Sequence, residues 1–184
     1  MIFTGNWFLD NYIMTDILSE VNYYCGTERK KIHKVSKGNG SMLYGTTWRS
    51  YLAPGRTRTP SPWVNLYYTK CHDEYPELEN IFKEFAKLYL NNFDYDQVQM
   101  NKNYTIPRHI DSKNVGESVL VAFGDYSEGG LTCVEYENKI VTYDPREKPV
   151  KFNGSKYYHY VTEHKGGDRY SLVFFKNNKK KLIN

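Results

Sequence analysis

The chain has 184 residues, with 25 Lys and Arg against 21 Asp and Glu, so its formal net charge is +4. This length fits one domain that needs no disulfides to fold. The three cysteines form no C-x-x-C pair, which excludes a disulfide framework and a cysteine-rich zinc site. No stretch approaches the ~20 apolar residues of a membrane span, and the N-terminus lacks a signal-peptide pattern. We expect a monomeric intracellular protein, cytoplasmic or nuclear (a viral protein acting inside its host cell included), with no membrane and no disulfide-linked partner.

Residues 1–95 are predicted to form a helical and basic loop region. Apolar residues recur at helical spacing over 13–21 and favour a short helix there. Residues 25–72 are basic, with Gly and Pro pairs that indicate loops. The clearest helix is expected over 76–91, where Pro76 suits the first turn and one side of the helix is apolar. This apolar stripe requires a sheet to cover.

The segment between Glu28 and Asp73 contains nine Lys and Arg residues and no acidic residue. It also contains several Trp and Tyr residues. Cations can neutralise phosphates, and aromatic rings can stack on exposed bases. We therefore predict a nucleic-acid partner, DNA rather than RNA, held by Arg49, Arg56 and Arg58. The alternative is a solvated basic face whose aromatic residues belong to the core.

From residue 96 onward the sequence is typical of short β-strands separated by turns. We expect strands near 96–101, 105–110, 118–124, 131–136, 139–143, 149–152, 157–163 and 169–176. Eight short strands at regular spacing are typical of a sandwich or a closed barrel. The prediction is one domain over 1–184, mainly β with flanking helices (α+β), with its core at 96–176 and a basic tail at 177–184.

The first candidate motif is an H-x-D at His109 and Asp111, on the strand predicted for 105–110. Alternate residues of a strand face one side, so the imidazole and the carboxylate would point to the same place. An isolated H-x-D is common by chance. It gains weight only if further ligands reach the same point.

Further polar residues occur on the last two predicted strands. The 157–163 strand carries His159, and the 169–176 strand carries Arg169 and Ser171 on one face. The turn at Gly166-Gly167 predicts a hairpin that would bring His159 beside Arg169. His164 is the competing candidate for the last ligand, but it lies in or beside this turn.

Together these residues have a chemical logic. Two histidines and one carboxylate on one face leave open positions on a metal, the arrangement of non-haem Fe(II) oxygenases. A guanidinium can bind the distal carboxylate of a 2-oxo acid in bidentate fashion, and a hydroxyl can add a further hydrogen bond. We therefore predict His109, Asp111 and His159 as metal ligands, with Arg169 and Ser171 holding a co-substrate.

The sequence resembles the 2-oxoglutarate- and Fe(II)-dependent dioxygenases with a double-stranded β-helix, and within them the TET/JBP group of nucleic-acid base oxidisers. The residues that carry the resemblance are Gln99-Met100-Asn101, His109-x-Asp111, Asn114 to Ser118, Gly124-Asp125-Tyr126, Gly129-Gly130-Leu131 and Arg169 to Phe175. It implies Fe(II), 2-oxoglutarate and O₂, and oxidation of the methyl group of 5-methylcytosine or thymine. Position and analogy add Asn101 and Tyr104 as co-substrate contacts.

The chain also departs from that group. Three scattered cysteines cannot form the zinc-binding insert of vertebrate TET enzymes, and no space remains for a separate DNA-binding domain. Two alternatives stay open at this point. One is the same chemistry on a protein side chain or a small metabolite, as in a prolyl hydroxylase. The other is a non-catalytic nucleic-acid-binding module with a degenerate barrel.

Overall fold

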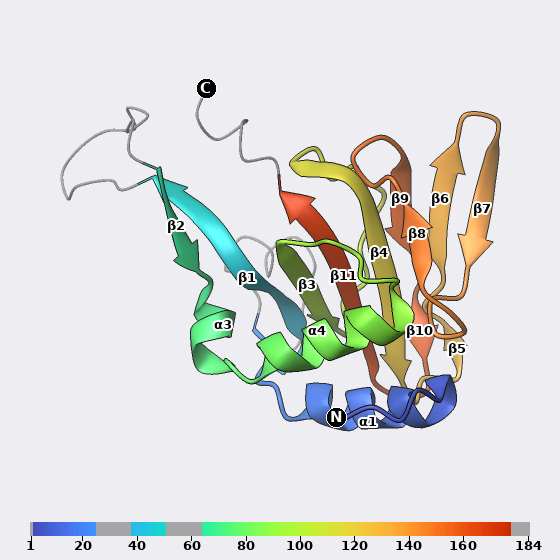
Figure 1. The fold of residues 1–184 in the computed structure, drawn as a ribbon. Coiled ribbons are helices and arrows are strands. Elements are labelled where there is room, and N and C mark those ends of the chain that lie inside the picture. Colours follow the sequence, from blue (N-terminus) through green and yellow to red (C-terminus); the bar gives the residue numbers. More distant parts are fainter. Residues whose placement is uncertain (1, 25–37, 51–63, 178–184) are drawn as a thin grey trace.

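A computed structural model describes residues 2–24, 38–50 and 64–177 of the chain (Figure 1). Its larger sheet has six antiparallel strands in the order β2-β1-β3-β11-β4-β8. Their bounds are Gly40–Ser50 for β1, Val64–Tyr68 for β2, Gln97–Lys102 for β3, Asn114–Gly124 for β4, Val150–Phe152 for β8 and Arg169–Asn177 for β11. The strands β3, β11 and β4 make up the centre of this sheet.

The smaller sheet has the order β7-β6-β9, with bounds Thr132–Tyr136 for β6, Lys139–Tyr143 for β7 and Tyr158–Val161 for β9. A single antiparallel bridge between His109 and His159 adds one more segment to its β9 edge. A two-residue pair completes the described strands, formed by β5 (Glu128–Gly129) and β10 (His164–Lys165). In Figure 1 the strands of the smaller sheet appear to the right of β4.

The order of segments in the two sheets identifies the fold. In chain order the eight core segments are β3, the His109 bridge, β4, β6, β7, β8, β9 and β11. The larger sheet contains the first, eighth, third and sixth, and the smaller contains the second, seventh, fourth and fifth. This alternation between two facing sheets is the double-stranded β-helix, or jelly roll. The predicted fold class is therefore confirmed.

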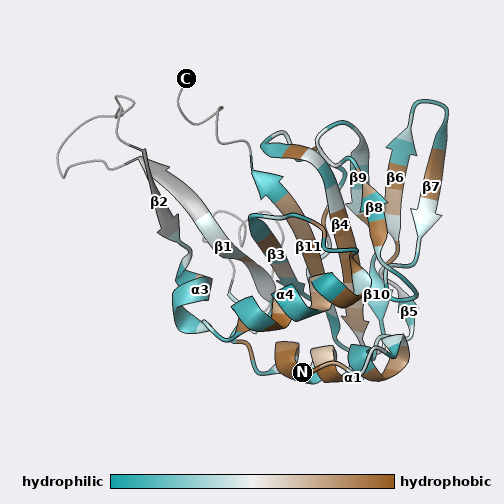
Figure 2. Ribbon diagram, in the orientation of Figure 1, coloured by the Kyte–Doolittle hydropathy of each residue, from teal (hydrophilic) through white to brown (hydrophobic). Residues whose placement is uncertain are grey.

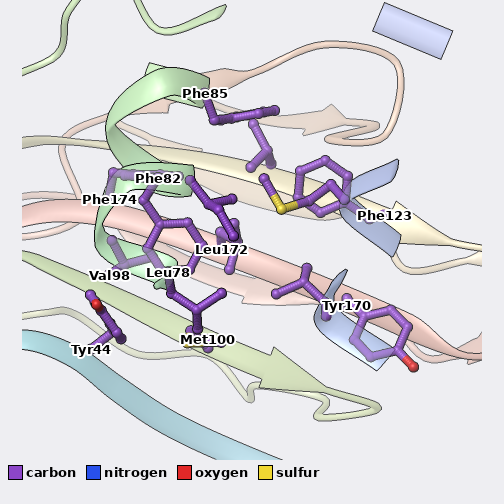
Figure 3. Close-up of a cluster of buried hydrophobic side chains, with 14 of the residues drawn as sticks. Tyr44, Leu78, Phe82, Phe85, Val98, Met100, Phe123, Tyr170, Leu172 and Phe174 are labelled. Carbon is purple, nitrogen blue, oxygen red and sulfur yellow. The ribbon is translucent and has the colours of Figure 1, made fainter. Parts of the chain in front are cut away.

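Three helices lie on one side of the larger sheet: α1 (Trp7–Ser19), α3 (Lys70–Glu74) and α4 (Leu78–Tyr89) (Figure 1). Hydrophobic residues run along the central strands (Figure 2). The apolar face of α4 packs on them, with Phe82 edge-on to Phe174 and Phe85 stacked on the same ring (Figure 3). Along β11, Leu172 and Phe174 face the helices while Val173 faces the smaller sheet. The strand is thus buried on both faces.

The structure differs from the predicted elements at two segments. The segment 25–72, expected to be loops, contains the strands β1 and β2, which extend the larger sheet beyond β3. The segment 105–110, expected to be a strand, makes only the bridge at His109. The predicted helices at 13–21 and 76–91 are present as α1 and α4 with shifted ends. Among the helices that the structure describes, none has the length and apolar character needed to cross a membrane.

A buried carboxylate ties the N-terminal segment to α4. Asp10 is fully buried and accepts hydrogen bonds from the Thr4 N–H and hydroxyl, from the Gly5 N–H and from the Tyr89 hydroxyl. Burial alone would raise the pKa of Asp10, but these hydrogen bonds outweigh it and lower the pKa below its ordinary value. The charged form is therefore the one that stabilises this corner.

We expect Asp10→Asn to lower the free energy of unfolding at pH 7 by about 2 kcal/mol, because hydrogen bonds to a charged acceptor are lost and an amide N–H then faces other donors. Since the folded-state pKa lies below the unfolded one, this stability is complete above the ordinary pKa and is lost as the pH falls through the lowered value. Urea denaturation from pH 7 to pH 3 should show a shallower acid dependence in the variant. Asp16→Asn, at an exposed position of the same helix, should change neither quantity.

Candidate metal and co-substrate site

Three candidate ligands meet between the two sheets. His109 and Asp111 lie on the segment between β3 and β4, and His159 lies on β9. One ligand atom from each residue lies within 4.8 Å of the others. The backbone fixes their spacing, because His109 and His159 each donate their N–H to the carbonyl of the other at 3.0 Å. The Asp111 N–H donates to the Gly154 carbonyl at 2.9 Å.

Both imidazoles are oriented by a carbonyl two residues earlier in the chain. The Nδ1 of His109 lies 2.7 Å from the Pro107 oxygen, and the Nδ1 of His159 lies 3.0 Å from the Tyr157 oxygen. A carbonyl can only accept, so each Nδ1 carries the hydrogen and each Nε2 of a neutral ring presents a lone pair. These Nε2 atoms lie 3.3 and 3.5 Å from the two carboxylate oxygens of Asp111. This is the arrangement that metal-binding histidines require.

The electrostatics of the cluster favour an anionic carboxylate. Burial would raise the pKa of Asp111, but hydrogen bonds and charge from His109 and His159 outweigh it and hold the pKa well below its usual range. Burial would likewise lower the pKa of His109, but the hydrogen bonds to Asp111 and Pro107 raise it overall. The Asn114 side-chain N–H also donates to Asp111 at 3.2 Å. A bound cation would stabilise the Asp111 carboxylate in place of the protons that it shares with the two imidazoles in the metal-free protein.

The predicted hairpin between the strands of His159 and Arg169 is wrong. The strand β9 pairs with β6 in the smaller sheet, whereas β11 pairs with β3 and β4 in the larger sheet. Between them β10 pairs with β5, so the chain crosses from one sheet to the other. The two strands nevertheless line one interior, because His159 and Val161 of β9 and Val173 and Phe175 of β11 border the same cavity.

Arg169 is almost completely buried. Its Nε donates to the Gly130 carbonyl at 3.2 Å, and its guanidinium lies over the Tyr126 ring, 5.8 Å from the centroid. Within the described residues, Nη2 has no hydrogen-bond partner and no carboxylate forms an ion pair with the side chain. Burial lowers the pKa of Arg169. A buried guanidinium is costly without an anion, so this position suits a carboxylate ligand.

Among the buried hydroxyls that lack a hydrogen-bond partner within the described residues, that of Thr132 on β6 lies in the cavity wall. The Tyr126 hydroxyl interacts with Arg169: burial raises the pKa of Tyr126, and the charge and a hydrogen bond of the guanidinium oppose that rise. Buried polar atoms are almost always hydrogen-bonded in native proteins. The Thr132 hydroxyl and Nη2 of Arg169, neither of which has a partner within the described residues, therefore suit a ligand with acceptor oxygens.

The remaining predicted co-substrate residues form a polar row across the larger sheet. Ser41, Asn101 and Ser171 lie in register on β1, β3 and β11. The Ser41 hydroxyl donates to the Asn101 side-chain oxygen at 2.6 Å, and the Asn101 side-chain N–H donates to the Ser171 hydroxyl oxygen at 3.2 Å. The Ser171 O–H hydrogen is thereby left for an acceptor. In this structure Asn101 orients Ser171, and Tyr104 lines the cavity.

A cavity of about 610 Å³ extends from the three candidate ligands along the inner face of the larger sheet. Apolar side chains form most of its middle, at Leu120, Phe152, Val161, Val173 and Phe175. Polar side chains from β1 and β3 border it as well, including Ser41, Gln97 and Gln99. A cavity of this size, apolar with a few fixed polar groups, is typical of a small-molecule site.

The predicted nucleic-acid contacts can be placed only in part. Arg49 belongs to the backbone of β1, and its side chain lies outside the described residues. Arg56 and Arg58 both lie outside the described residues. His164, the competing ligand, is not in the cluster; its Nε2 lies 3.1 Å from the Asn103 side-chain oxygen.

Sequence reasoning did not identify three residues that shape the site: Asn114, Thr132 and Gly154. Asn114 belongs to a resemblance motif and Gly154 to the Asn153-Gly154 turn signal, but neither pattern points to the metal site, and Thr132 belongs to no recognisable pattern. A Cβ at Gly154 would lie 3.1 Å from an Asp111 carboxylate oxygen and 3.3 Å from Cε1 of His159. Only glycine gives both ligands their present positions without displacement.

We therefore expect Gly154→Ala to weaken metal binding about tenfold, in the range found when groups that support metal ligands are altered. The cause is the added methyl group, which must push the carboxylate or the imidazole by a few tenths of an ångström. The free energy of unfolding of the metal-free protein should fall by only about 1 kcal/mol. Metal titration with calorimetric detection measures the first quantity. An unchanged dissociation constant would contradict the assigned role of Gly154.

Comparisons with known proteins find similarity to solved structures alone. No family model matches the chain, and no curated protein does. Among solved structures, NgTET1 in complex with 5mC DNA is 18% identical with a TM-score of 0.49, covering 75% of this chain and 61% of its own. A 2OG-Fe(II) oxygenase-family oxidoreductase from Burkholderia pseudomallei is 19% identical with a TM-score of 0.42, covering 61% and 60%. This chain thus spans about three fifths of the length of each.

A Pseudomonas putida prolyl-4-hydroxylase is 14% identical with a TM-score of 0.46, covering 96% of this chain and 89% of its own. The order of segments in the two sheets establishes the fold independently of these similarities. The ligand cluster of two histidines and one carboxylate is the facial triad typical of non-haem Fe(II) oxygenases. The chain therefore combines the double-stranded β-helix with the facial-triad arrangement that characterises the 2-oxoglutarate- and Fe(II)-dependent oxygenases.

Proposed function

We propose that this chain is an Fe(II)- and 2-oxoglutarate-dependent oxygenase that hydroxylates the methyl group of a nucleic-acid base, 5-methylcytosine or thymine. The observation that carries the oxygenase assignment is the presence of two complementary sites between the same two sheets, a metal cluster in the cavity wall and Arg169 on the cavity-facing side of β11, beyond the residues that line the cavity. The His109, Asp111 and His159 cluster suits a divalent cation. The buried guanidinium of Arg169, without a counter-ion among the described residues, suits the distal carboxylate of the co-substrate.

The residues of the chain would act mainly by binding and orientation. His109, Asp111 and His159 would hold Fe(II), while Arg169, Ser171 and the hydroxyl of Thr132 would hold 2-oxoglutarate. When bound, iron with O₂ and 2-oxoglutarate supplies the oxidising chemistry, in which one oxygen atom enters a C–H bond and the other leaves in succinate, with release of CO₂. The apolar wall of Leu120, Phe152 and Val173 would exclude water from this chemistry.

The nucleic-acid part of the proposal rests on charge and on the resemblance of the sequence. The nine Lys and Arg residues without an acidic neighbour between Glu28 and Asp73 create a local positive field that suits a polyanion. The strands β1 and β2 belong to this basic segment, and they join the larger sheet beside β3, which borders the cavity. An enzyme that oxidises a base must take it out of the stack, and the cations of this segment would hold the backbone while it does.

The deciding experiment is mass spectrometry of nucleosides after incubation with Fe(II), 2-oxoglutarate and oligonucleotides that contain 5-methylcytosine or thymine. We expect one of these nucleosides to gain the mass of an oxygen atom, with stoichiometric formation of succinate. Succinate formation without any modified nucleoside would show that the oxygenase assignment is correct and the substrate assignment wrong. If the protein neither bound iron nor formed succinate, both the oxygenase assignment and the substrate assignment would be excluded.

A further inference from the structure

The side-chain amide of Gln99 is held in one orientation at the wall of the cavity. Its Nε2 donates to the Met42 carbonyl at 2.6 Å and to the Ser41 hydroxyl oxygen at 3.0 Å. Because a backbone carbonyl can only accept, the nitrogen must face Met42 and the amide cannot turn around. Ser41 strengthens this orientation, since its own O–H is donated to Asn101.

The consequence concerns the other end of the amide. Gln99 is half-buried and borders the cavity, and its Oε1 accepts no hydrogen bond from any residue within the described ranges. Because the position of the Gln99 Nε2 is fixed, the position of its acceptor oxygen Oε1 is fixed as well. Whatever ligand fills this part of the cavity encounters a carbonyl-type oxygen that cannot exchange places with an N–H donor.

Gln97, two residues earlier on the same face of β3, provides a contrast. Its Nε2 donates to the Thr46 carbonyl at 2.6 Å, so its orientation is fixed in the same way. Its Oε1, however, already accepts a hydrogen bond from the Asn177 side chain at 3.2 Å. Both amides are fixed by a backbone carbonyl, but Gln97 is buried and its oxygen is already bonded. The oxygen of the half-buried Gln99 has no partner within the described ranges and remains to be matched by a ligand.

We propose that Gln99 determines the substrate specificity of this site, by accepting a hydrogen bond from the exocyclic amino group of a methylated cytosine. This rests on the proposed function. The methyl group at C5 is adjacent to the substituent at C4, so a base whose methyl faces the metal cluster presents its C4 group to the neighbouring wall. Cytosine carries an amino donor at C4 and thymine a carbonyl acceptor. A fixed acceptor attracts the first and repels the second.

The test compares three oligonucleotides that carry one central 5-methylcytosine, thymine or 5-methyl-2-pyrimidinone, in which hydrogen replaces the amino group. Binding to the metal-free protein is measured by fluorescence anisotropy, and oxidation of the central base by mass spectrometry with Fe(II) and 2-oxoglutarate. We expect 5-methylcytosine to be bound roughly five- to tenfold more tightly than either analogue, the range for one net hydrogen bond. The ratio of kcat/KM values should show the same preference.

Gln99→Met keeps the length of the side chain and removes the acceptor, so both preferences should fall to about one. Gln97→Met is the matched control and should keep them, because the oxygen it removes is already bonded to Asn177. Ser41→Ala leaves only the Met42 carbonyl to hold the amide and should reduce the preference in part. The ratio between substrates is insensitive to a general loss of folded protein, which circular dichroism would report separately.

The outcomes separate this inference from the proposed function. Oxidation of a base without any preference for the amino group, or a preference that Gln99→Met retains, would overturn the role of Gln99 and leave the oxygenase assignment standing. Selective binding that Gln99→Met abolishes, without oxidation of the base, would support the role of Gln99 and exclude base oxidation. No binding of any of the three oligonucleotides would exclude both.

Discussion

Replacing His109 with alanine should abolish iron-dependent succinate formation and weaken Fe(II) binding by at least about 100-fold, beyond the loss that follows from altering a supporting group. The substitution removes one of three ligand atoms that lie within 4.8 Å of one another. It also removes a hydrogen-bond partner that keeps Asp111 charged. Anaerobic titration with Fe(II), followed by calorimetry, measures the binding directly and does not depend on knowing the substrate.

The matched control is His164→Ala. This histidine lies five residues after His159 and was the competing candidate for the last ligand, but its ring contacts Asn103 and not the cluster. Its removal should leave the Fe(II) dissociation constant unchanged. If His109→Ala bound iron as tightly as the unmodified protein, or if His164→Ala lost binding, the assigned ligand set would be wrong.

Replacing Arg169 should separate binding of the co-substrate from stability of the fold. With 2-oxoglutarate bound, truncation of a buried, hydrogen-bonded charge pair costs about 2–5 kcal/mol, so Arg169→Met should raise the 2-oxoglutarate dissociation constant by roughly 30-fold or more. The 2-oxoglutarate dissociation constant of Arg169→Lys should lie between those of the unmodified protein and Arg169→Met, because an ammonium keeps the charge but lacks the bidentate geometry. Equilibrium titration with 2-oxoglutarate under anaerobic conditions, with Fe(II) present, gives these constants.

The ligand-free protein should respond in the opposite direction. A buried guanidinium without a counter-ion lowers the stability of the fold, so Arg169→Met should unfold at equal or higher urea concentration than the unmodified protein. Addition of 2-oxoglutarate at 100 times its dissociation constant should stabilise the unmodified protein by about 2.7 kcal/mol and the Met variant by less than about 1 kcal/mol at the same concentration. Equal stabilisation of both proteins would place the co-substrate elsewhere.

The parts of the fold that local sequence specifies were predictable. The apolar stripe of α4 and the turn-separated strands from β3 to β11 follow from periodicity and from Gly, Asn and Pro. The strand β1 was missed because several of its residues, such as Met42 and Tyr44, are buried alongside Ser41 on the opposite face, so no alternation of apolar and polar residues marks it. Its basic flanks indicated loops instead.

The site likewise has residues that local sequence reveals and residues that it does not. His109 and Asp111 are two residues apart, so a local motif reveals them, whereas the partners of β9 and β11 depend on contacts between distant segments. Both strands could have formed a hairpin by local criteria, and the sheet to which each belongs is decided by burial of its inner face. Thr132 belongs to no motif and Gly154 only to a turn signal, and their importance comes from the atoms that the fold brings next to them.

The reciprocal backbone pair between His109 and His159 has a consequence for how a metal ion would enter and leave. Two N–H···O bonds of 3.0 Å, rather than the ion, set the separation of the two imidazoles. Because the imidazoles are already in position, little free energy is lost to rearranging the site when the ion binds. Binding of the ion and its removal by a chelator should then be rapid and reversible. The far-ultraviolet circular dichroism spectrum should stay constant throughout, unlike in small domains that fold only around their metal.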